Sequence, residues 1–452
     1  MSFIKKIFPD RHPFRLAYHK MKAVAAAFYY GFPANKMTII GVTGTKGKTT
    51  TCHLITKIFE GSGHKVGMTT STHYQIAGNR WVNKTKQNTP SPFTLQRMLR
   101  DMVKAGCTHA ILEISSHAVT QHRIFGVNVD TAVLTQIDED HIEYHGSHKA
   151  YRTEKLKLFR TLGSGKRKAN IKKVAVLNQD DKYFDEFKDV SSDLTYTYGL
   201  SRGTCTAEFI NLNADGTDFV LKIPNQNERI VTKLVGKFNV YNTLAAISAA
   251  LANGISTHAI KDALAELLPI PGRQEWIDTG QKFSVIVDYA HTVDSLRQLC
   301  EIFKPLTKGR LILVFGCTGG GRDKAKRPKM GEVADKFADF IVLTDDDPYT
   351  EDRMSILTNI AKGIKRCEGP AAGGRGLWLI PERKGAIRLA LAVARATDTV
   401  IISGKGCEEV QAIGTKLIPW DDRKVAREFL SRELNLTLHG GEKIKGNKCF
   451  SS

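Results

Sequence analysis

Short apolar runs alternate with helix-compatible segments over residues 37–270. The first run, residues 37–42, precedes a helical pattern at 52–60, and another helical pattern covers 95–105. Three later runs have the length and composition of buried strands: residues 110–112, 131–134 and 174–177. This alternation predicts a central α/β domain with a mostly parallel sheet.

The same alternation resumes beyond Pro271-Gly272, which we interpret as a hinge. Helical patterns separate four strand-like runs: residues 285–287, 311–315, 341–343 and 400–402. We therefore expect a second, Rossmann-like α/β domain over residues 271–452. Residues 193–234 differ, because short alternating strands around Asp215-Gly216 predict an antiparallel patch.

Residues 1–36 precede both domains. A helical pattern at 14–32 mixes apolar residues with Arg15, Lys20 and Lys22 and stops at Gly31 and Pro33. Such a basic amphipathic segment either packs on the central domain or lies on a membrane surface. The pattern supports both interpretations.

Composition narrows the class of protein. With 42% hydrophobic and 25% charged residues, the chain has the composition of a globular protein. No apolar run reaches the ~20 residues of a membrane span. The N-terminus has no signal-peptide pattern. Eight cysteines without a C-x-x-C pair fit reduced thiols in a cytoplasmic protein, which we expect to be monomeric.

The formal net charge is +20, and basic residues cluster at 166–168, 172–173 and 322–329. Nucleic acid, an anionic membrane surface or a polyphosphate substrate could each explain this charge. No aromatic stacking platform or finger motif accompanies the clusters. We therefore favour solvated basic faces and phosphate-handling sites over a specific nucleic-acid partner.

The most informative segment is Gly44-x-x-Gly47-Lys48-Thr49, between the first strand and the first helix. Glycines let the backbone wrap around phosphates, a lysine adds charge, and a threonine hydroxyl can hold Mg²⁺. The spacing departs from the usual P-loop, so a chance turn is the alternative. The strand before it and the helix after it favour a nucleoside-triphosphate site.

Acidic residues follow two of the predicted strands. Glu113 comes directly after the run at 110–112, and residues 138–141, which end in His141, follow the next run. Ligand sites in α/β proteins form at such strand ends. A single Glu or His there is usually structural, but two clusters beside a P-loop predict a metal–ATP site.

Ordered motifs along the chain complete the pattern: residues 43–50, 113–117, 140–146, 154–159, 236–242, 271–275, 288–292, 315–317, 322–328, 404–406 and 421–423. On these residues the chain resembles the Mur ligase superfamily of ATP-dependent amide-bond ligases. Ser115-Ser116-His117 and Asp288-Tyr289-Ala290-His291-Thr292 are most similar to its UDP-N-acetylmuramyl-tripeptide synthetase branch.

The resemblance implies that ATP converts a substrate carboxylate into an acyl phosphate, which an amine then attacks. It implies two Mg²⁺ ions, one on Thr49 and Glu113 and the other on His141 and a carbamylated Lys155. Without the resemblance, Lys155 would read as a surface helix lysine. The catalytic residues implied are Lys48, Glu113, His141 and Lys155. Those implied to bind ATP are Gly44, Thr45, Lys46, Gly47, Lys48, Thr49, Thr50, Asn242, Arg273 and Asp288.

The acceptor residues implied by the resemblance are Thr89, Pro90, Ser115, Gln121 and Arg123. Relatives that take meso-diaminopimelate present an arginine from an Asp-Asn-Pro-Arg motif, whereas residues 346–349 here read Asp-Asp-Pro-Tyr. Tyr349 cannot pair bidentately with a carboxylate and Asp347 would repel one, so we expect lysine, ornithine or a small neutral amino acid. Gly404 and Glu408 would face the substrate amine. The alternative is a solvated turn at 345–347.

Members of this branch carry an N-terminal domain that grips the UDP part of the acceptor. Only 36 residues precede the first strand, too few for an independent core, so we expect that domain to be absent. Three hypotheses remain: a muramyl-peptide ligase, a folylpolyglutamate-synthase-like or poly-glutamate-synthase-like ligase on another γ-carboxylate, and a basic nucleic-acid-associated ATPase. The Ser-Ser-His and Asp-Tyr-Ala-His segments favour the first.

Overall fold

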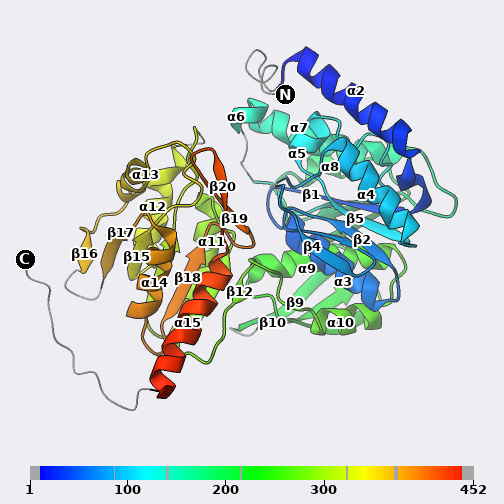
Figure 1. The fold of residues 1–452 in the computed structure, drawn as a ribbon. Helices are drawn as coiled ribbons and strands as arrows, with labels where there is room; N and C mark the ends of the chain where they lie inside the picture. Colours follow the sequence, from blue (N-terminus) through cyan, green and yellow to red (C-terminus); the bar gives the residue numbers. More distant parts are fainter. Residues whose placement is uncertain are drawn as a thin grey trace, which may run out of the picture. The chain divides into compact units, whose positions relative to one another are not determined.

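The computed structural model describes residues 11–85, 87–138, 142–213, 216–321, 324–370 and 375–439. These residues form two compact units that divide between Leu268 and Pro269. Each unit is an α/β structure built on its own sheet, which confirms the expected fold class (Figure 1). His141, Asp215 and the two residues Arg322 and Asp323 lie outside the described residues.

An eleven-stranded sheet forms the first unit, in the order β11-β10-β9-β8-β7-β6-β1-β5-β2-β3-β4. The strands from β2 through β9 in this order are parallel, and the remaining strands pair antiparallel. Their bounds are β1 Thr38–Thr43, β2 Val66–Thr69, β3 His73–Ile76, β4 Asn79–Val82, β5 His109–Glu113, β6 Thr131–Leu134, β7 Val174–Asn178, β8 Leu194–Gly199, β9 Cys205–Asn213, β10 Gly216–Ile223 and β11 Gln226–Thr232.

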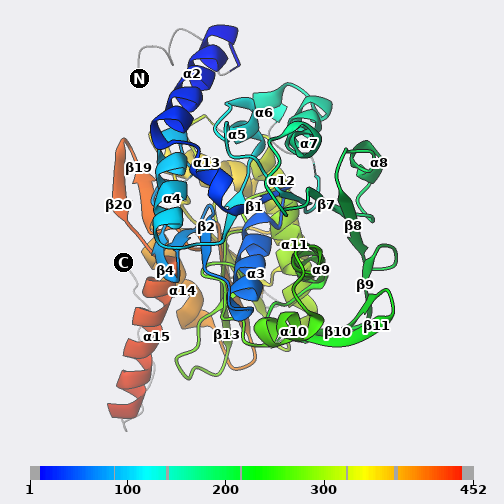
Figure 2. The same ribbon diagram turned by 90° about the vertical axis from the view of Figure 1, so that its right-hand side faces the viewer.

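Helices cover both faces of this sheet. On one face α3, α9 and α10 pack together; on the other lie α4, α7 and α8, with α2 outside α4 (Figures 1 and 2). The bounds are α2 Pro13–Tyr30, η1 Pro33–Lys36, α3 Lys48–Gly61, α4 Pro92–Lys104, α5 Ser116–Thr120, α6 Ile142–His145, α7 His148–Ser164, α8 Phe184–Phe187, α9 Lys237–Ala252 and α10 Thr257–Ala265.

The predicted antiparallel patch is correct only in part. Strands β9, β10 and β11 pair antiparallel, but β8 runs parallel to β7 and so extends the main sheet. Strand β8 pairs parallel although it is only partly buried, as an antiparallel strand commonly is, so its alternating pattern does not reveal its direction.

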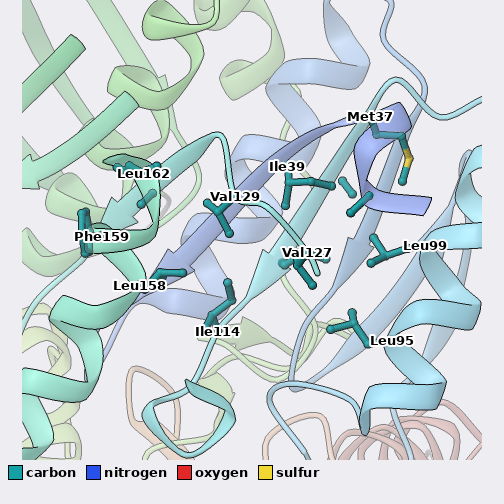
Figure 3. Close-up of a cluster of buried hydrophobic side chains, with 14 of the residues drawn as sticks. Met37, Ile39, Leu95, Leu99, Ile114, Val127, Val129, Leu158, Phe159 and Leu162 are labelled. Carbon is teal, nitrogen blue, oxygen red and sulfur yellow. The ribbon is translucent and has the colours of Figure 1, made fainter. Parts of the chain in front are cut away.

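The core under α4 and α7 is apolar and fully enclosed. Side chains from the two helices meet residues of β1 and of the loop before β6, as Figure 3 shows for Ile39, Leu95, Leu99, Val129 and Phe159. Each of these except Val129 has no exposed surface, and full burial of such a side chain contributes about 1.5–3 kcal/mol. This core fixes β1, and therefore the loop that follows it.

The second unit contains a seven-stranded sheet in the order β12-β13-β18-β14-β15-β17-β16. Both faces are covered, which explains the uninterrupted apolar runs: alternate residues of β14 enter two different cores. The strands are β12 Glu275–Trp276, β13 Ser284–Asp288, β14 Leu311–Phe315, β15 Phe340–Leu343, β16 Gly369–Pro370, β17 Gly376–Leu379 and β18 Thr399–Ser403, with a separate pair β19 Val410–Ile413 and β20 Lys416–Pro419.

Among the described residues of the second unit, five helices accompany the sheet. Three cover one face of the sheet and two cover the other. Several begin at a side-chain cap; Thr292 and Ser295, for example, form a capping box, and such caps typically contribute about 1 kcal/mol. The helices are α11 Val293–Leu306, α12 Lys326–Phe337, α13 Arg353–Ala361, α14 Arg383–Val393 and α15 Asp422–His439.

Candidate active site

The loop between β1 and α3 depends on two glycines. Gly44 has φ 150° and Gly47 has φ 81°. A Cβ on Gly44 would lie 1.9 Å from Thr135 Oγ1, and one on Gly47 would lie 2.1 Å from Asn242 Oδ1. The loop is therefore packed between the ends of β6 and α9, with the N-terminus of α3 available to an anion.

Two lysines converge on one backbone oxygen of this loop. Lys48 Nζ donates to Gly44 O at 3.0 Å and to Thr45 O at 2.8 Å. Lys155 Nζ, from α7, donates to the same Gly44 O at 2.6 Å. Lys155 is 1% exposed and lies 4.4 Å from the centre of the Tyr151 ring. Lys155 is thus not a surface lysine but a buried cation beside the loop.

Oxygen donors gather around Glu113, at the end of β5. Its buried carboxylate accepts from Thr49 Oγ1 and Ser71 N, both at 2.9 Å, and from Asn88 Nδ2 at 2.6 Å. Ser71 Oγ lies 2.9 Å from Thr49 Oγ1. A carboxylate with two hydroxyls is a set of hard oxygen ligands, which suits Mg²⁺. No group of three or more His, Cys, Asp or Glu side chains that could hold a metal ion occurs in the described ranges, which do not include His141.

The remaining predicted residues of the loop are held by the segment after β6. Thr45 Oγ1 lies 3.0 Å from the Tyr151 hydroxyl and donates to Asp138 O, while Lys46 Nζ pairs with Asp138 at 3.0 Å. Thr50 is buried in the first turn of α3. The acidic segment after β6 therefore reaches the P-loop through Asp138, as its strand-end position predicts.

The predicted acceptor residues form one network behind Glu113. Thr89 Oγ1 donates to Glu113 O at 2.9 Å and accepts from Ser115 N at 3.1 Å. Arg123 donates to Thr89 O at 2.8 Å and to Gln121 Oε1 at 2.7 Å. Burial lowers the pKa of Arg123, so its guanidinium is partly stripped of water. Pro90 is buried next to Thr89.

In the second unit, Arg273 and Asp288 lie close together. The Arg273 guanidinium lies over the Tyr289 ring at 4.5 Å, and Asp288 accepts from Gln274 N at 2.8 Å and Ala290 N at 2.7 Å. Burial raises the pKa of Asp288, and the charge of Arg273 opposes that rise. Among the described residues, Arg273 Nε is buried without a hydrogen-bond acceptor.

Three carboxylates surround one ammonium at the ends of β15 and β18. Lys405 Nζ contacts Asp347 at 2.7 Å, Glu408 at 2.5 Å and Asp346 at 3.8 Å. We call these four residues the acidic cluster. Burial lowers the pKa of Lys405, but Asp346, Glu408 and Asp347 outweigh it and raise that pKa above its ordinary value.

The segment at 345–347 is not a solvated turn, because Asp345, Asp346 and Asp347 are each at most 5% exposed. Ala412 N donates to Asp347 Oδ1 at 2.8 Å, and Tyr349, at φ 50°, exchanges backbone hydrogen bonds with Ala412 and Gly414. Gly404 lies beside Asp346: its Cβ, if present, would be 3.6 Å from Asp346 Oδ2.

Sequence reasoning missed Ser71, Asn88 and Tyr151, although each contacts a predicted residue. A signal existed only for Ser71, which follows the end of β2 and so satisfies the strand-end rule used for Glu113. Lys405 lay in a quoted motif but was assigned no role.

A P-loop on a parallel sheet, with a buried carboxylate and two lysines beside it, defines the class of P-loop α/β proteins. Residues 42–250 match the Mur ligase middle domain, and residues 272–406 match the Mur ligase glutamate ligase domain. A Bacillus cereus UDP-N-acetylmuramoyl-L-alanyl-D-glutamate--2,6-diaminopimelate ligase is 39% identical over 414 residues, covering 91% of this chain and 82% of that protein.

Solved structures agree. A UDP-N-acetylmuramoyl-L-alanyl-D-glutamate--2,6-diaminopimelate ligase has a TM-score of 0.62 at 32% identity, covering 88% of this chain and 79% of that one. Mycobacterium tuberculosis folylpolyglutamate synthase complexed with ADP has a TM-score of 0.68 at 17% identity, covering 92% and 94%, which shows the fold alone. The chain belongs to the Mur ligase family, whose members are ATP- and Mg²⁺-dependent, ADP-forming ligases.

Proposed function

We propose that this protein joins an amino acid to the carboxylate of a muramyl-peptide acceptor by way of an acyl phosphate. One observation carries the proposal: Lys48 and Lys155 both contact the loop between β1 and α3, and Glu113 contacts Thr49 at the start of α3. The relative named above acts on UDP-N-acetylmuramoyl-L-alanyl-D-glutamate, which ends in such a carboxylate. The folate and nucleic-acid alternatives have no comparable support, since the folylpolyglutamate synthase likeness is one of fold.

The chemistry has two steps. The acceptor carboxylate attacks the γ-phosphorus of ATP, which forms the acyl phosphate and releases ADP; the amine then attacks the acyl carbon and expels phosphate. Both reactants of the first step are anions, so positive charge must gather where they meet. Lys48 supplies it from the loop, and the N–H groups at the start of α3 supply partial charge.

Magnesium would be held by Thr49 and Glu113, with Ser71 completing the oxygen set. It would neutralise charge on the phosphate oxygens. Asn88 and Ser71 N hold the Glu113 carboxylate in place for that role. We assign a second ion to His141 and to Lys155 in carbamylated form.

Carbamylation suits the position of Lys155. The ammonium first loses a proton; the neutral amine then adds CO₂, which forms an N–C bond and releases a second proton, so that a carboxylate-like anion replaces a cation. The side chain is buried beside Gly44 O, where a modified lysine would stay ordered. This assignment explains why a helix such as α7 places a lysine in the protein interior, which is otherwise rare.

Nucleotide contacts beyond the loop are assigned to Asn242, Arg273 and Asp288. Asn242 already lies against Gly47, and Arg273 retains an unsatisfied Nε among the described residues. The acceptor is assigned to the network of Thr89, Pro90, Ser115, Gln121 and Arg123, whose partly desolvated guanidinium favours an anionic group. The enzyme is proposed to act as a monomer.

The acidic cluster is assigned to the incoming amino acid. Its contacts place three carboxylates around a single ammonium, so an additional cation would be attracted and a distal carboxylate repelled. The resemblance implies that Tyr349 takes the place of the arginine that relatives binding meso-diaminopimelate present. We therefore propose lysine or ornithine as the preferred substrate, with Gly404 and Glu408 facing its amine.

The test is phosphate release from ATP with UDP-N-acetylmuramoyl-L-alanyl-D-glutamate and a panel of lysine, ornithine, alanine and meso-diaminopimelate. We expect release that requires both acceptor and amino acid and is fastest with lysine or ornithine. In Asp347→Asn, which keeps an oxygen for Lys405, the preference for these substrates should shrink several-fold. A clear preference for meso-diaminopimelate would refute the amino-acid assignment. Release with a folate acceptor and glutamate only would overturn the proposed function.

A further inference from the structure

Helix α2 is apolar on two opposite faces. Ala23, Ala26 and Ala27 are buried on the face that packs toward α4. On the opposite side, residues spaced three or four positions apart share one face of the helix. We call this face the outer face of α2; its residues are Phe14, Tyr18, Met21, Ala25, Phe28 and Tyr29.

This outer face is open to solvent. Phe14, Met21, Phe28 and Tyr29 are between 64% and 76% exposed, a contiguous set of large apolar side chains on one helix. Isolated exposed apolar residues need no explanation, but a contiguous patch marks an interaction surface. Phe93 of α4 extends the patch, since its ring centre lies 6.4 Å from that of Tyr29.

The charges around the face indicate what covers it. Residues 13–30 include Arg15, Lys20 and Lys22 and contain no Asp or Glu. A second copy of the chain, packed face to face, would bring these cations against their own equivalents. An anionic lipid surface instead provides opposite charge for the cations and an apolar boundary for the aromatic and methionine side chains.

The geometry suits a helix that lies flat. Among the described residues, no helix combines the length and apolarity needed to cross a bilayer. The 18 residues of α2 give a length of about 27 Å along one face. We propose that the outer face of α2 docks this enzyme on the surface of a membrane that contains anionic lipid, with Met21, Phe28 and Tyr29 at the acyl boundary and Lys20 and Lys22 near the headgroups.

The test is flotation of the full chain with vesicles of phosphatidylcholine alone or with 30% phosphatidylglycerol. The variant Met21→Gln/Phe28→Gln/Tyr29→Gln keeps the net charge and good helix formers. The matched control, Leu268→Gln/Met354→Gln/Leu417→Gln, removes three exposed apolar residues elsewhere. Circular dichroism and ATP turnover without vesicles should be unchanged in both, since none of the six lies in the proposed active site.

We expect the wild-type chain and the control to bind anionic vesicles, and the α2 variant to bind at least about tenfold more weakly. Lys20→Gln/Lys22→Gln should lose several-fold, as should the wild type in 0.5 M salt. Equal binding by the wild type and the α2 variant would overturn the proposal, because charge alone would then explain it. So would absence of binding, or a wild-type dimer that the α2 variant converts to a monomer.

Discussion

The P-loop region of the first unit and the acidic cluster of the second both lie at the ends of parallel strands, but they are built in different ways. In the P-loop region, Lys48 and Lys155 donate to the backbone oxygen of Gly44, and neighbouring side chains fill the space beside two glycines. In the acidic cluster, the Lys405 ammonium instead contacts the side-chain carboxylates of Asp346, Asp347 and Glu408.

The difference teaches which parts of such an enzyme can change. A loop shaped by backbone geometry and glycines loses its conformation when one of these glycines is replaced by a residue with a side chain. A cluster of side chains on a fixed backbone can exchange one side chain for another without moving the strands. The loop to which we assign the phosphates is therefore constrained, whereas the acidic cluster, to which we assign the amino acid, is adjustable within the same fold.

The largest effect is expected from Lys48→Ala and Glu113→Ala. Each should lower amino-acid-dependent ATP turnover by about 10²-fold or more, because each removes an electrostatic contact where charge develops. Steady-state phosphate release measures the loss, and circular dichroism checks that the fold is retained. Near-normal turnover in either variant would refute the assignment of this region.

Lys155→Ala should also lose most activity, but differently. If carbamylated Lys155 is a ligand, formate or acetate at millimolar concentration should restore part of the turnover by occupying the vacated place. Lys157→Ala is the matched control, since Lys157 lies on the same helix with its side chain 51% exposed. A fully active Lys155→Ala, or equal effects of the carboxylates on both variants, would count against carbamylation.

The smallest effect on chemistry, and the clearest effect on stability, is expected behind the acidic cluster. Buried Arg327 donates to both oxygens of Glu351 and to Thr318 O, and Thr318 Oγ1 donates to Asp346. Hydrogen bonds from Arg327 and, to a smaller extent, Lys324, together with their positive charges, lower the pKa of Glu351 to about 2. A lowered folded-state pKa stabilises the fold above the ordinary pKa of about 4.5, and this contribution disappears as pH falls toward about 2.

In Glu351→Gln, urea unfolding at pH 7 should show a loss of about 3 kcal/mol, because Arg327 stays buried without its carboxylate. The difference from the wild type should shrink between pH 4.5 and 2. Asp185→Asn, which breaks the exposed pair with Lys188, should lose less than about 1 kcal/mol. A pH-independent difference would show that the ion pair does not set the acid sensitivity.

Local patterns predicted the P-loop region well. The runs at 131–134 and 311–315 coincide with β6 and β14, and Glu113 was found because the end of a parallel strand is a special position. The loop, its strand and its helix are contiguous, so sequence order already places Lys48 and Thr49 next to Gly44.

The acidic cluster could be predicted from the sequence only in part, because Asp346 and Asp347 are far from Lys405 and Glu408 along the chain. Asp345, Asp346 and Asp347 have the composition of a solvated turn, yet all three are buried, and Asp347 contacts Lys405 and Ala412 of β19. Asn88 gave no signal, since it belongs to no motif and reaches Glu113 only through the tertiary fold. Lys155 is buried and Lys157 is exposed because they lie on different sides of α7. The hydrophobic pattern of the sequence does not show which side of this helix faces the sheet.

The strand order also determines when, during synthesis, the loop between β1 and α3 can reach its folded position. Strand β1 pairs with β5 and β6, so Thr38 must find His109 and Ile40 must find Thr131. The chain therefore has to extend through β6 before the strand that carries the loop is flanked on both sides. Strands β9, β10 and β11, by contrast, pair with strands that are next to them along the chain. Strand β1 is thus synthesised before both of its partners, and until they follow its apolar surface is exposed to chaperones and to other nascent chains.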